Sequence, residues 1–129
     1  MNADQQTEQA IVLAGANVAP RVMPDDIEAN IVEEHYFTAR DGCEGACGGG
    51  GTYPVGLGLL TFCVLTLRNG FTVTGESACA SPENFNAEIG RKIARANAVN
   101  KIWPLMGYAL KEQLAHGVWI KGTLEETAD

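Results

Sequence analysis

The chain has 129 residues, of which 46% are hydrophobic and 19% charged, so it is long enough for one compact domain and too short for two. This composition excludes wholesale disorder. Sixteen acidic and nine basic side chains give a net charge of −7, which excludes a protein that coats bulk nucleic acid. No apolar stretch approaches the roughly 18 residues of a membrane span, and Asp4 and Glu8 stand where an export signal would carry basic residues. We therefore expect a soluble, cytoplasmic protein with no membrane partner.

The N-terminal part of the sequence combines a polar segment with one short helix. Residues 1–19 are rich in Gln, Asn, Ala and Asp, and they predict a mobile tail in front of a single domain at 20–115. Pro24 followed by two aspartates is typical of the first turn of a helix, because proline needs no donor there and carboxylates favour the positive end of the helix dipole. The apolar face of this helix would hold Ile27, Ile31 and either Val32 or His35.

Residues 41–58 form a segment in which eight of eighteen residues are glycine, which predicts a flexible loop. The segment also carries Cys43 and Cys47, whose spacing suits one half of a zinc site that His35, Cys63 or Cys79 would complete. The competing interpretation is four reduced, inert thiols, because a cysteine inside an apolar strand behaves as a small hydrophobe.

The run LLTFCVLTLRNGFTVTGES predicts a β-hairpin, because two β-branched and aromatic runs flank Asn69 and Gly70. A two-residue type I′ turn at this pair would place Arg68 opposite Phe71. With this two-residue turn, one sheet face would carry Phe62, Val64, Phe71 and Val73, and the other would carry Cys63, Leu65 and Leu67 beside Thr72 and Thr74. Residues 36–39 are candidates for a third strand.

A long helix follows the hairpin. It is expected to begin between Ser81 and Asn86, both of which are good N-caps, and to end or kink at Pro104. The apolar stripe of this long helix would hold Phe85, Ile89, Ile93, Ala96 and Trp103, broadened by Ala94, Ala98 and Ile102. A second helix would cover residues 105–114, and residues 116–129 would form a docked arm or a tail. The fold class predicted by these elements is α+β, with a short helix, a hairpin of two or three strands and a long helix broken at Pro104.

Basic residues gather in the acidic chain between Arg68 and Lys111, where six basic side chains stand against three acidic ones. Small hydrogen-bonding side chains lie in the same part of the sequence. Together they could hold a phosphate or a nucleotide, and the alternative is a solvated helix face with capping residues. The candidate ligand-binding residues are Arg91, Lys92, Arg95, Arg68, Thr72, Thr74, Ser77, Ser81, Asn84 and Asn86.

Enzyme signatures are missing from the sequence. The two histidines, His35 and His116, are in no metal-binding pattern, and Ser77 and Ser81 have no nucleophile-elbow context. The sequence therefore predicts a protein that is not an enzyme and needs no cofactor.

Three runs of the sequence, NGFTVTGESACASPENF, IGRKIA and KIWPLMGY, closely resemble the small tailed-phage family of gene-product-forty-nine-like proteins. The resemblance covers residues 20 to about 115. It implies a phage or prophage origin, expression in the cytoplasm of an infected bacterium and an accessory rather than structural role. It carries no activity to this chain.

A small, acidic, non-enzymatic phage protein is expected to bind a host component. The first hypothesis is an anti-defence protein that sequesters a nucleotide immune signal, by analogy with small oligomeric phage proteins of that kind. The second is an acidic inhibitor that binds a host protein directly, and the third is a zinc module or metal-dependent enzyme that uses Cys43 and Cys47. A homo-oligomer is also expected, with Trp103 and Trp119 as contact residues.

Overall fold

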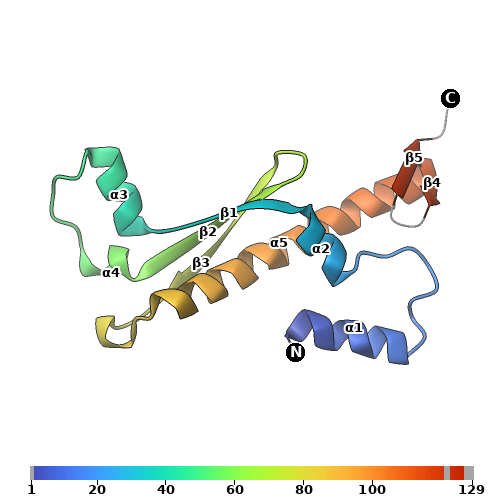
Figure 1. Cartoon of the computed structure of the whole chain (residues 1–129), viewed down its shortest axis with the longest axis horizontal. Coiled ribbons are helices and arrows are strands. Elements are labelled where there is room, and N and C mark those ends of the chain that lie inside the picture. The colour runs from blue at the N-terminus through green and yellow to red at the C-terminus, as the bar shows by residue number, and fades with distance from the viewer. Residues whose placement is uncertain (1, 121–122, 127–129) are drawn as a thin grey trace. The chain divides into compact units, whose positions relative to one another are not determined.

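The computed structural model describes residues 2–120 and 123–126, and it confirms the α+β class (Figure 1). The chain divides into two compact units. The sheet unit holds residues 31–101, and the terminal unit holds the residues up to Asn30 together with those from Ile102 onward. The elements of the sheet unit are β1 (Ile31–Thr38), α3 (Ala39–Cys47), α4 (Val55–Gly58), β2 (Leu60–Leu67), β3 (Thr72–Ala78), the 3₁₀ turn η1 (Pro82–Asn84) and the first half of α5 (Ala87–His116).

The sheet unit is built on an antiparallel sheet in the order β1-β2-β3. The expected third strand at residues 36–39 is present, but it starts earlier, at Ile31, and ends at Thr38. The helix that begins at Pro24, α2 (Pro24–Asn30), therefore ends before Ile31, and the predicted helical face was wrong beyond Ile27. Ile31, Val32 and His35 lie in β1 instead, because the run IVEEHYF is rich in β-branched and aromatic residues that favour a strand.

The turn between β2 and β3 differs by one residue from the predicted type I′ turn. Leu67 rather than Arg68 faces Phe71, since the Leu67 N–H donates to the Phe71 carbonyl at 2.8 Å, and Gly70 alone has a positive φ, +90°. A three-residue turn with glycine in this conformation replaces the two-residue turn, which needs positive φ at both central residues. As a result, Leu65 pairs with Val73 and Cys63 with Gly75.

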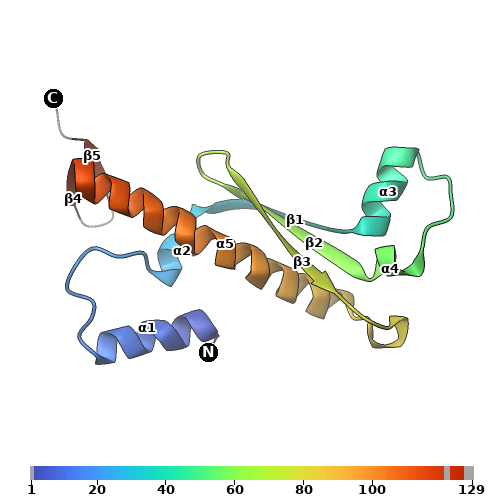
Figure 2. The ribbon, with the colours of Figure 1, turned by 180° about the vertical axis from the view of Figure 1, so that it is seen from behind.

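This register changes the faces of the hairpin, because a shift of one residue turns every side chain of a strand to the other side. The face expected to combine leucines with threonines instead carries Thr61, Cys63, Leu65 and Leu67 beside Val73, and all five are buried. Phe62, Val64, Thr72 and Thr74 lie on the opposite, partly exposed face. The buried face packs against the first half of α5, which lies alongside β3 in both views (Figures 1 and 2).

The contact between β3 and α5 is formed by small residues, of which Ala94 and Ala98 were predicted to lie on the buried face of the helix. A Cβ on Gly75 would lie 2.1 Å from the Ala94 carbonyl oxygen and 2.3 Å from the Ala98 nitrogen, so the two backbones approach as closely as they can. Ala94 and Ala98 are fully buried there. Ile89 and Ile93, predicted to lie in the core stripe, are 56% and 47% exposed because they lie to one side of this contact.

The helix α5 continues through Pro104 to His116, so the predicted break was wrong. A proline inside a helix removes one hydrogen bond and crowds the carbonyl four residues earlier, at a cost of about 3 kcal/mol. Packing of the helix offsets this cost: Ile102, two residues before the proline, is fully buried.

The terminal unit contains more regular structure than the sequence predicted. Residues 1–19, expected to be a tail, include α1 (Ala3–Leu13), which begins with a capping box between Asn2 and Gln5. After α5, β4 (Gly117–Ile120) pairs antiparallel with β5 (Thr123–Glu126), where an arm or tail was expected. Trp103 is half-buried and its indole N–H donates to Asp4 at 3.4 Å, whereas the Trp119 side chain lies outside the described residues. Among the described residues, the structure contains no helix that is both long and apolar enough to cross a membrane.

The segment 41–58, predicted to be a flexible loop, also contains helices. Thr38 and Asp41 form a capping box that starts α3, and Gly48 ends this helix in the left-handed conformation with φ +76°. A single turn, α4, comes before β2. The start and the end of α3 could therefore be predicted from the Thr38–Asp41 capping pair and from Gly48, although the high glycine content of the segment favours a loop.

Candidate binding site

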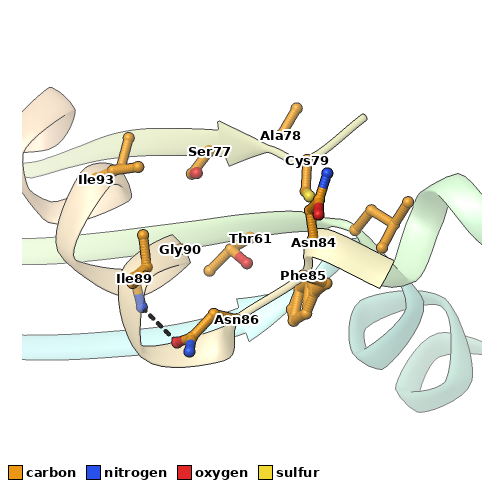
Figure 3. Close-up of a pocket in the computed structure, with 11 residues that line it drawn as sticks. Thr61, Ser77, Ala78, Cys79, Asn84, Phe85, Asn86, Ile89, Gly90 and Ile93 are labelled. Atoms are coloured by element: carbon orange, nitrogen blue, oxygen red, sulfur yellow. Dashed lines mark hydrogen bonds between the residues drawn. The ribbon is translucent and has the colours of Figure 1, made fainter. Parts of the chain in front are cut away.

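A small cavity of about 140 Å³ opens at one end of the sheet unit, where the end of β3, η1 and the first turns of α5 meet (Figure 3). We call it the N-terminal pocket of α5. Its lining combines uncharged polar side chains with an aromatic ring and aliphatic groups. The lining residues are Leu59, Thr61, Ser77, Ala78, Cys79, Asn84, Phe85, Asn86, Ile89, Gly90 and Ile93.

The sheet positions two hydroxyl groups in this pocket. Thr61 of β2 pairs with Ser77 of β3, and both side chains lie on the sheet face that α5 covers. Thr61 is only 4% exposed. A Cβ on Gly90 would lie 3.1 Å from the Thr61 hydroxyl oxygen, so the glycine keeps this space open.

The Thr61 hydroxyl forms no hydrogen bond within the described part of the chain. Among the described residues, every side-chain oxygen or nitrogen that is fully enclosed has a hydrogen-bond partner. Since the Thr61 hydroxyl has none, it is not fully enclosed, and it reaches solvent through the pocket. A hydroxyl that reaches solvent can bond to water, so a polar ligand atom beside Thr61 would take the place of that water.

The segment between β3 and α5 supplies the amide groups of the pocket. Ser81 precedes η1, and its carbonyl accepts from the Asn84 N–H at 3.1 Å, which fixes the turn. The Asn86 side-chain oxygen accepts from the Ile89 N–H at 3.0 Å and so caps α5 (Figure 3). This bond leaves the Asn86 NH₂ group free of the cap, and Phe85 lies between the two asparagines in sequence.

The pocket also contains one thiol. Cys79 donates to the Ser81 carbonyl at 3.2 Å, and its own N–H donates to the Leu59 carbonyl at 3.0 Å. These two bonds tie the end of β3 to β2 and to η1. The thiol therefore has a structural partner, and it stands beside no histidine or carboxylate among the residues that line the pocket.

Three of the ten predicted ligand-binding residues, Ser77, Asn84 and Asn86, line the pocket, and Ser81 supports it through its backbone. Thr72 and Thr74 do not, because the observed register turns them to the opposite sheet face. There the Thr74 hydroxyl lies 3.4 Å from a Glu76 carboxylate oxygen and 3.5 Å from the Lys101 ammonium.

The predicted basic residues do not join the polar ones. Arg91 and Lys92 are exposed on α5, whereas Arg95 forms an ion pair with Glu34 of β1. Arg68 lies in the turn between β2 and β3. No charged side chain lines the pocket among the described residues. The predicted cluster of cations and small polar groups is therefore divided over separate parts of the sheet unit.

Titratable groups beneath α5 form a second cluster, around Tyr36 and Cys63, which are paired across β1 and β2. Burial, together with the Cys63 thiol and the Glu34 carboxylate, raises the pKa of Tyr36 to about 12. Burial also raises the pKa of Cys63, which is fully enclosed. A thiol in this state is a poor nucleophile, so Cys63 is a core residue.

The cysteines considered for zinc lie on α3, where Cys43 and Cys47 are one helical turn apart. The Tyr53 hydroxyl donates to the Cys43 carbonyl at 3.4 Å beside them. Within the part of the chain that the structure describes, no three side chains of the His, Cys, Asp and Glu types lie close enough together to hold a metal ion. His35, Cys63 and Cys79 all lie on other elements, so none of them completes a group with this pair.

Comparison with protein families places the chain. Residues 22–114 match the model of the Phage protein (N4 Gp49/phage Sf6 gene 66) family, and this match covers most of the chain. The chain belongs to this phage protein family. No curated protein and no solved structure gave a significant match.

The part of the chain shared with the phage family includes every residue that lines the pocket, whereas α1, β4 and β5 lie outside it. Sequence reasoning missed Thr61, Phe85 and Gly90 in the pocket. Thr61 reads as an ordinary strand residue, and Gly90 as a weak point of a helix. The one signal that could have found them is the glycine itself, because glycine inside a helix costs about 1 kcal/mol relative to alanine and often marks a close contact.

Proposed function

We propose that this member of the phage family is an accessory protein that binds a small nucleotide of the infected host and holds it chemically unchanged. In this role it would act against host defence by removing a nucleotide immune signal. The observation that carries the proposal is the N-terminal pocket of α5, where the hydroxyls of Thr61 and Ser77 and the amides of Asn84 and Asn86 line one cavity beside the ring of Phe85.

The composition of the pocket favours binding over catalysis. Its lining contains no carboxylate, histidine, lysine or arginine among the described residues, so no acid, base or charged electrophilic group is present to drive a reaction. Its one thiol bonds to a backbone carbonyl. Small-ligand sites typically combine apolar walls with a few well-placed polar groups, which is the composition found here.

The test of this proposal separates binding from turnover. The purified protein is mixed with cyclic and linear nucleotides, bound ligand is isolated by gel filtration, and the complex is denatured by heat. We expect one class of nucleotide to be depleted from solution and released with its mass unchanged. Failure to retain any nucleotide would contradict binding, and release of a converted product would contradict a non-enzymatic role.

A second candidate function is inhibition of a host protein by direct binding, and the outer face of the sheet favours it. Phe37 and Phe62 lie there with ring centroids 5.6 Å apart, and Phe37 is 39% exposed. Glu76 pairs with Phe62 across the strands, so a partner would need an apolar patch with a basic group at its edge. Phe62→Asp would abolish binding to such a partner and leave nucleotide retention intact.

The subunit count belongs to the same proposal. We expect a homo-oligomer, and native mass spectrometry of the protein purified from bacterial cells reads the subunit count and any retained small molecule together. A monomer would contradict the oligomer alone, because the pocket is formed within one sheet unit.

A further inference from the structure

The pocket and the basic residues lie in different places, and this separation bears on which part of a nucleotide the pocket receives. Phosphate groups are recognised by arginine, lysine or a run of free backbone N–H groups. Arg91 and Lys92 are exposed outside the pocket lining, and Arg95 is paired with Glu34. The polar side chains inside the pocket are hydroxyls, amides and one thiol, none of which is a cation, and the Asn86 oxygens already accept from the Ile89 and Gly90 N–H groups at the start of α5.

The chemistry of the polar groups suits a flat heterocycle. Asn84 carries a donor and an acceptor on one planar amide, the group that pairs with the edge of a nucleobase, and Asn86 adds the NH₂ donor that its cap bond leaves free. Phe85, between them in sequence, offers an aromatic face on which a base can stack (Figure 3). Thr61, which is 4% exposed as a residue, contributes a hydroxyl that forms no hydrogen bond within the described residues and reaches solvent through the pocket.

The size of the pocket sets a limit on the ligand. Its volume of about 140 Å³ is well below the roughly 300–1,000 Å³ of pockets that enclose a drug-sized molecule. It can take one ring system but not a whole nucleotide. Gly90 contributes to this volume directly, since a methyl group there would reach to within 3.1 Å of the Thr61 oxygen.

We propose that the N-terminal pocket of α5 receives the uncharged base of the nucleotide, with Thr61 as its innermost hydrogen-bonding group, and leaves the phosphates outside. This inference rests on the proposed function and narrows it. It makes the nucleoside, not the phosphate, the part that is recognised.

Calorimetric titration with the four common nucleosides, their monophosphates and inorganic phosphate tests the inference. We expect the preferred nucleoside to bind within about threefold of its monophosphate, and inorganic phosphate not to compete. If the monophosphate binds and the nucleoside does not, or if phosphate competes, the base assignment is overturned while the proposed function stands. If neither nucleosides nor nucleotides bind, both are overturned.

Two variants locate the binding. Thr61→Val removes the hydroxyl and keeps the shape of the side chain, and Gly90→Ala places a methyl group against that hydroxyl. Each should weaken nucleoside binding about tenfold, the size of one well-placed hydrogen bond. Thr66→Val, on the opposite face of β2, and Gly107→Ala, in α5 with no atom near its Cβ position, serve as matched controls. Thermal unfolding checks that all four variants fold. Equal losses in the test and control variants, or no loss in any, would overturn the assignment to this pocket.

Discussion

Gly75 lies at the contact between β3 and α5 in the sheet unit. Its missing side chain lets β3 approach α5 until the position of a Cβ lies 2.1 Å from the Ala94 carbonyl oxygen. The neighbours of Gly75 are backbone atoms of α5, which cannot turn aside as a flexible side chain would. The smallest side chain at this position must therefore separate the two elements.

We predict that Gly75→Ala lowers the free energy of unfolding by about 3 kcal/mol, the upper range for overpacking a core. Gly107→Ala, also a single added methyl group, should raise it by up to about 1 kcal/mol, because its Cβ position is open and alanine favours a helix. Urea denaturation of the two variants measures both values. Equal stability of the two variants would show that β3 and α5 do not approach this closely.

Tyr36 gives a prediction about pH. The pKa of Tyr36 is raised from 10.0 to about 12 in the folded protein, so the folded state holds this proton more tightly than the unfolded chain does. Its contribution to stability is thus complete below pH 10 and is lost as the pH rises from about 10 to about 12. The Tyr36→Phe variant should lose less stability over this range than the parent protein, as measured by urea denaturation at each pH. Identical pH profiles would contradict the raised pKa.

At the level of single residues, the sequence located part of the pocket but not its centre. Ser77, Asn84 and Asn86 were predictable because small polar residues before a helix are capping candidates. Thr61 was not, because its role comes from its pairing with Ser77 and from Gly90 opposite, and both depend on tertiary structure. Arg95 was expected to bind a ligand but pairs with Glu34, which is far from it in sequence.

Among the elements, the β2-β3 hairpin shows how one turn decides the chemistry of a face. The sequence predicted both strands correctly, since their residues favour strands whatever the turn. It did not predict the register, because Asn-Gly suits a two-residue turn, while the hairpin uses Gly70 alone in the left-handed conformation. Because of this shift of one residue, Thr72 and Thr74, which were both predicted to bind the ligand, lie on the sheet face away from α5.

The helix α5 contains an exposed proline in its interior, at Pro104. We predict that Pro104→Ala raises the free energy of unfolding by about 2 kcal/mol. This is less than the roughly 3 kcal/mol of helix propensity, because proline also restricts the unfolded chain. Chemical denaturation measures the change. A variant no more stable than the parent would indicate that the helix is interrupted at this residue in solution.

For the whole molecule, which has a net charge of −7, the salt dependence of nucleotide affinity shows which part of the ligand is held. A nucleotide held by its base in an uncharged pocket should bind with nearly the same affinity at all salt concentrations, whereas the affinity of one held through its phosphates by Arg91 and Lys92 should fall as salt is added. We predict that raising NaCl from about 50 to about 500 mM changes nucleotide affinity by less than threefold. A fall of tenfold or more, measured by calorimetry, would assign the phosphates to the basic residues.

The overall class was the most predictable property of the molecule. The spacing of hydrophobic residues and the turn residues predicted the α+β class. The motifs of residues 20–115 predicted the phage family, which the family match then showed over residues 22–114. The helices α1 and α3 were missed because polar and glycine-rich composition masked their capping boxes. The division into two units that share α5 could not be foreseen, because the helix was expected to end or kink at Pro104.

Mapping nucleotide binding by NMR shows directly where the ligand lies, by following the backbone amides of the labelled protein as the preferred nucleoside monophosphate is added. We predict that the largest shifts fall on Thr61, Ser77 and residues 84–90, which surround the pocket. Shifts confined to Thr72 and Thr74, or to residues 91–95 alone, would contradict the claim that the N-terminal pocket of α5 is the binding site.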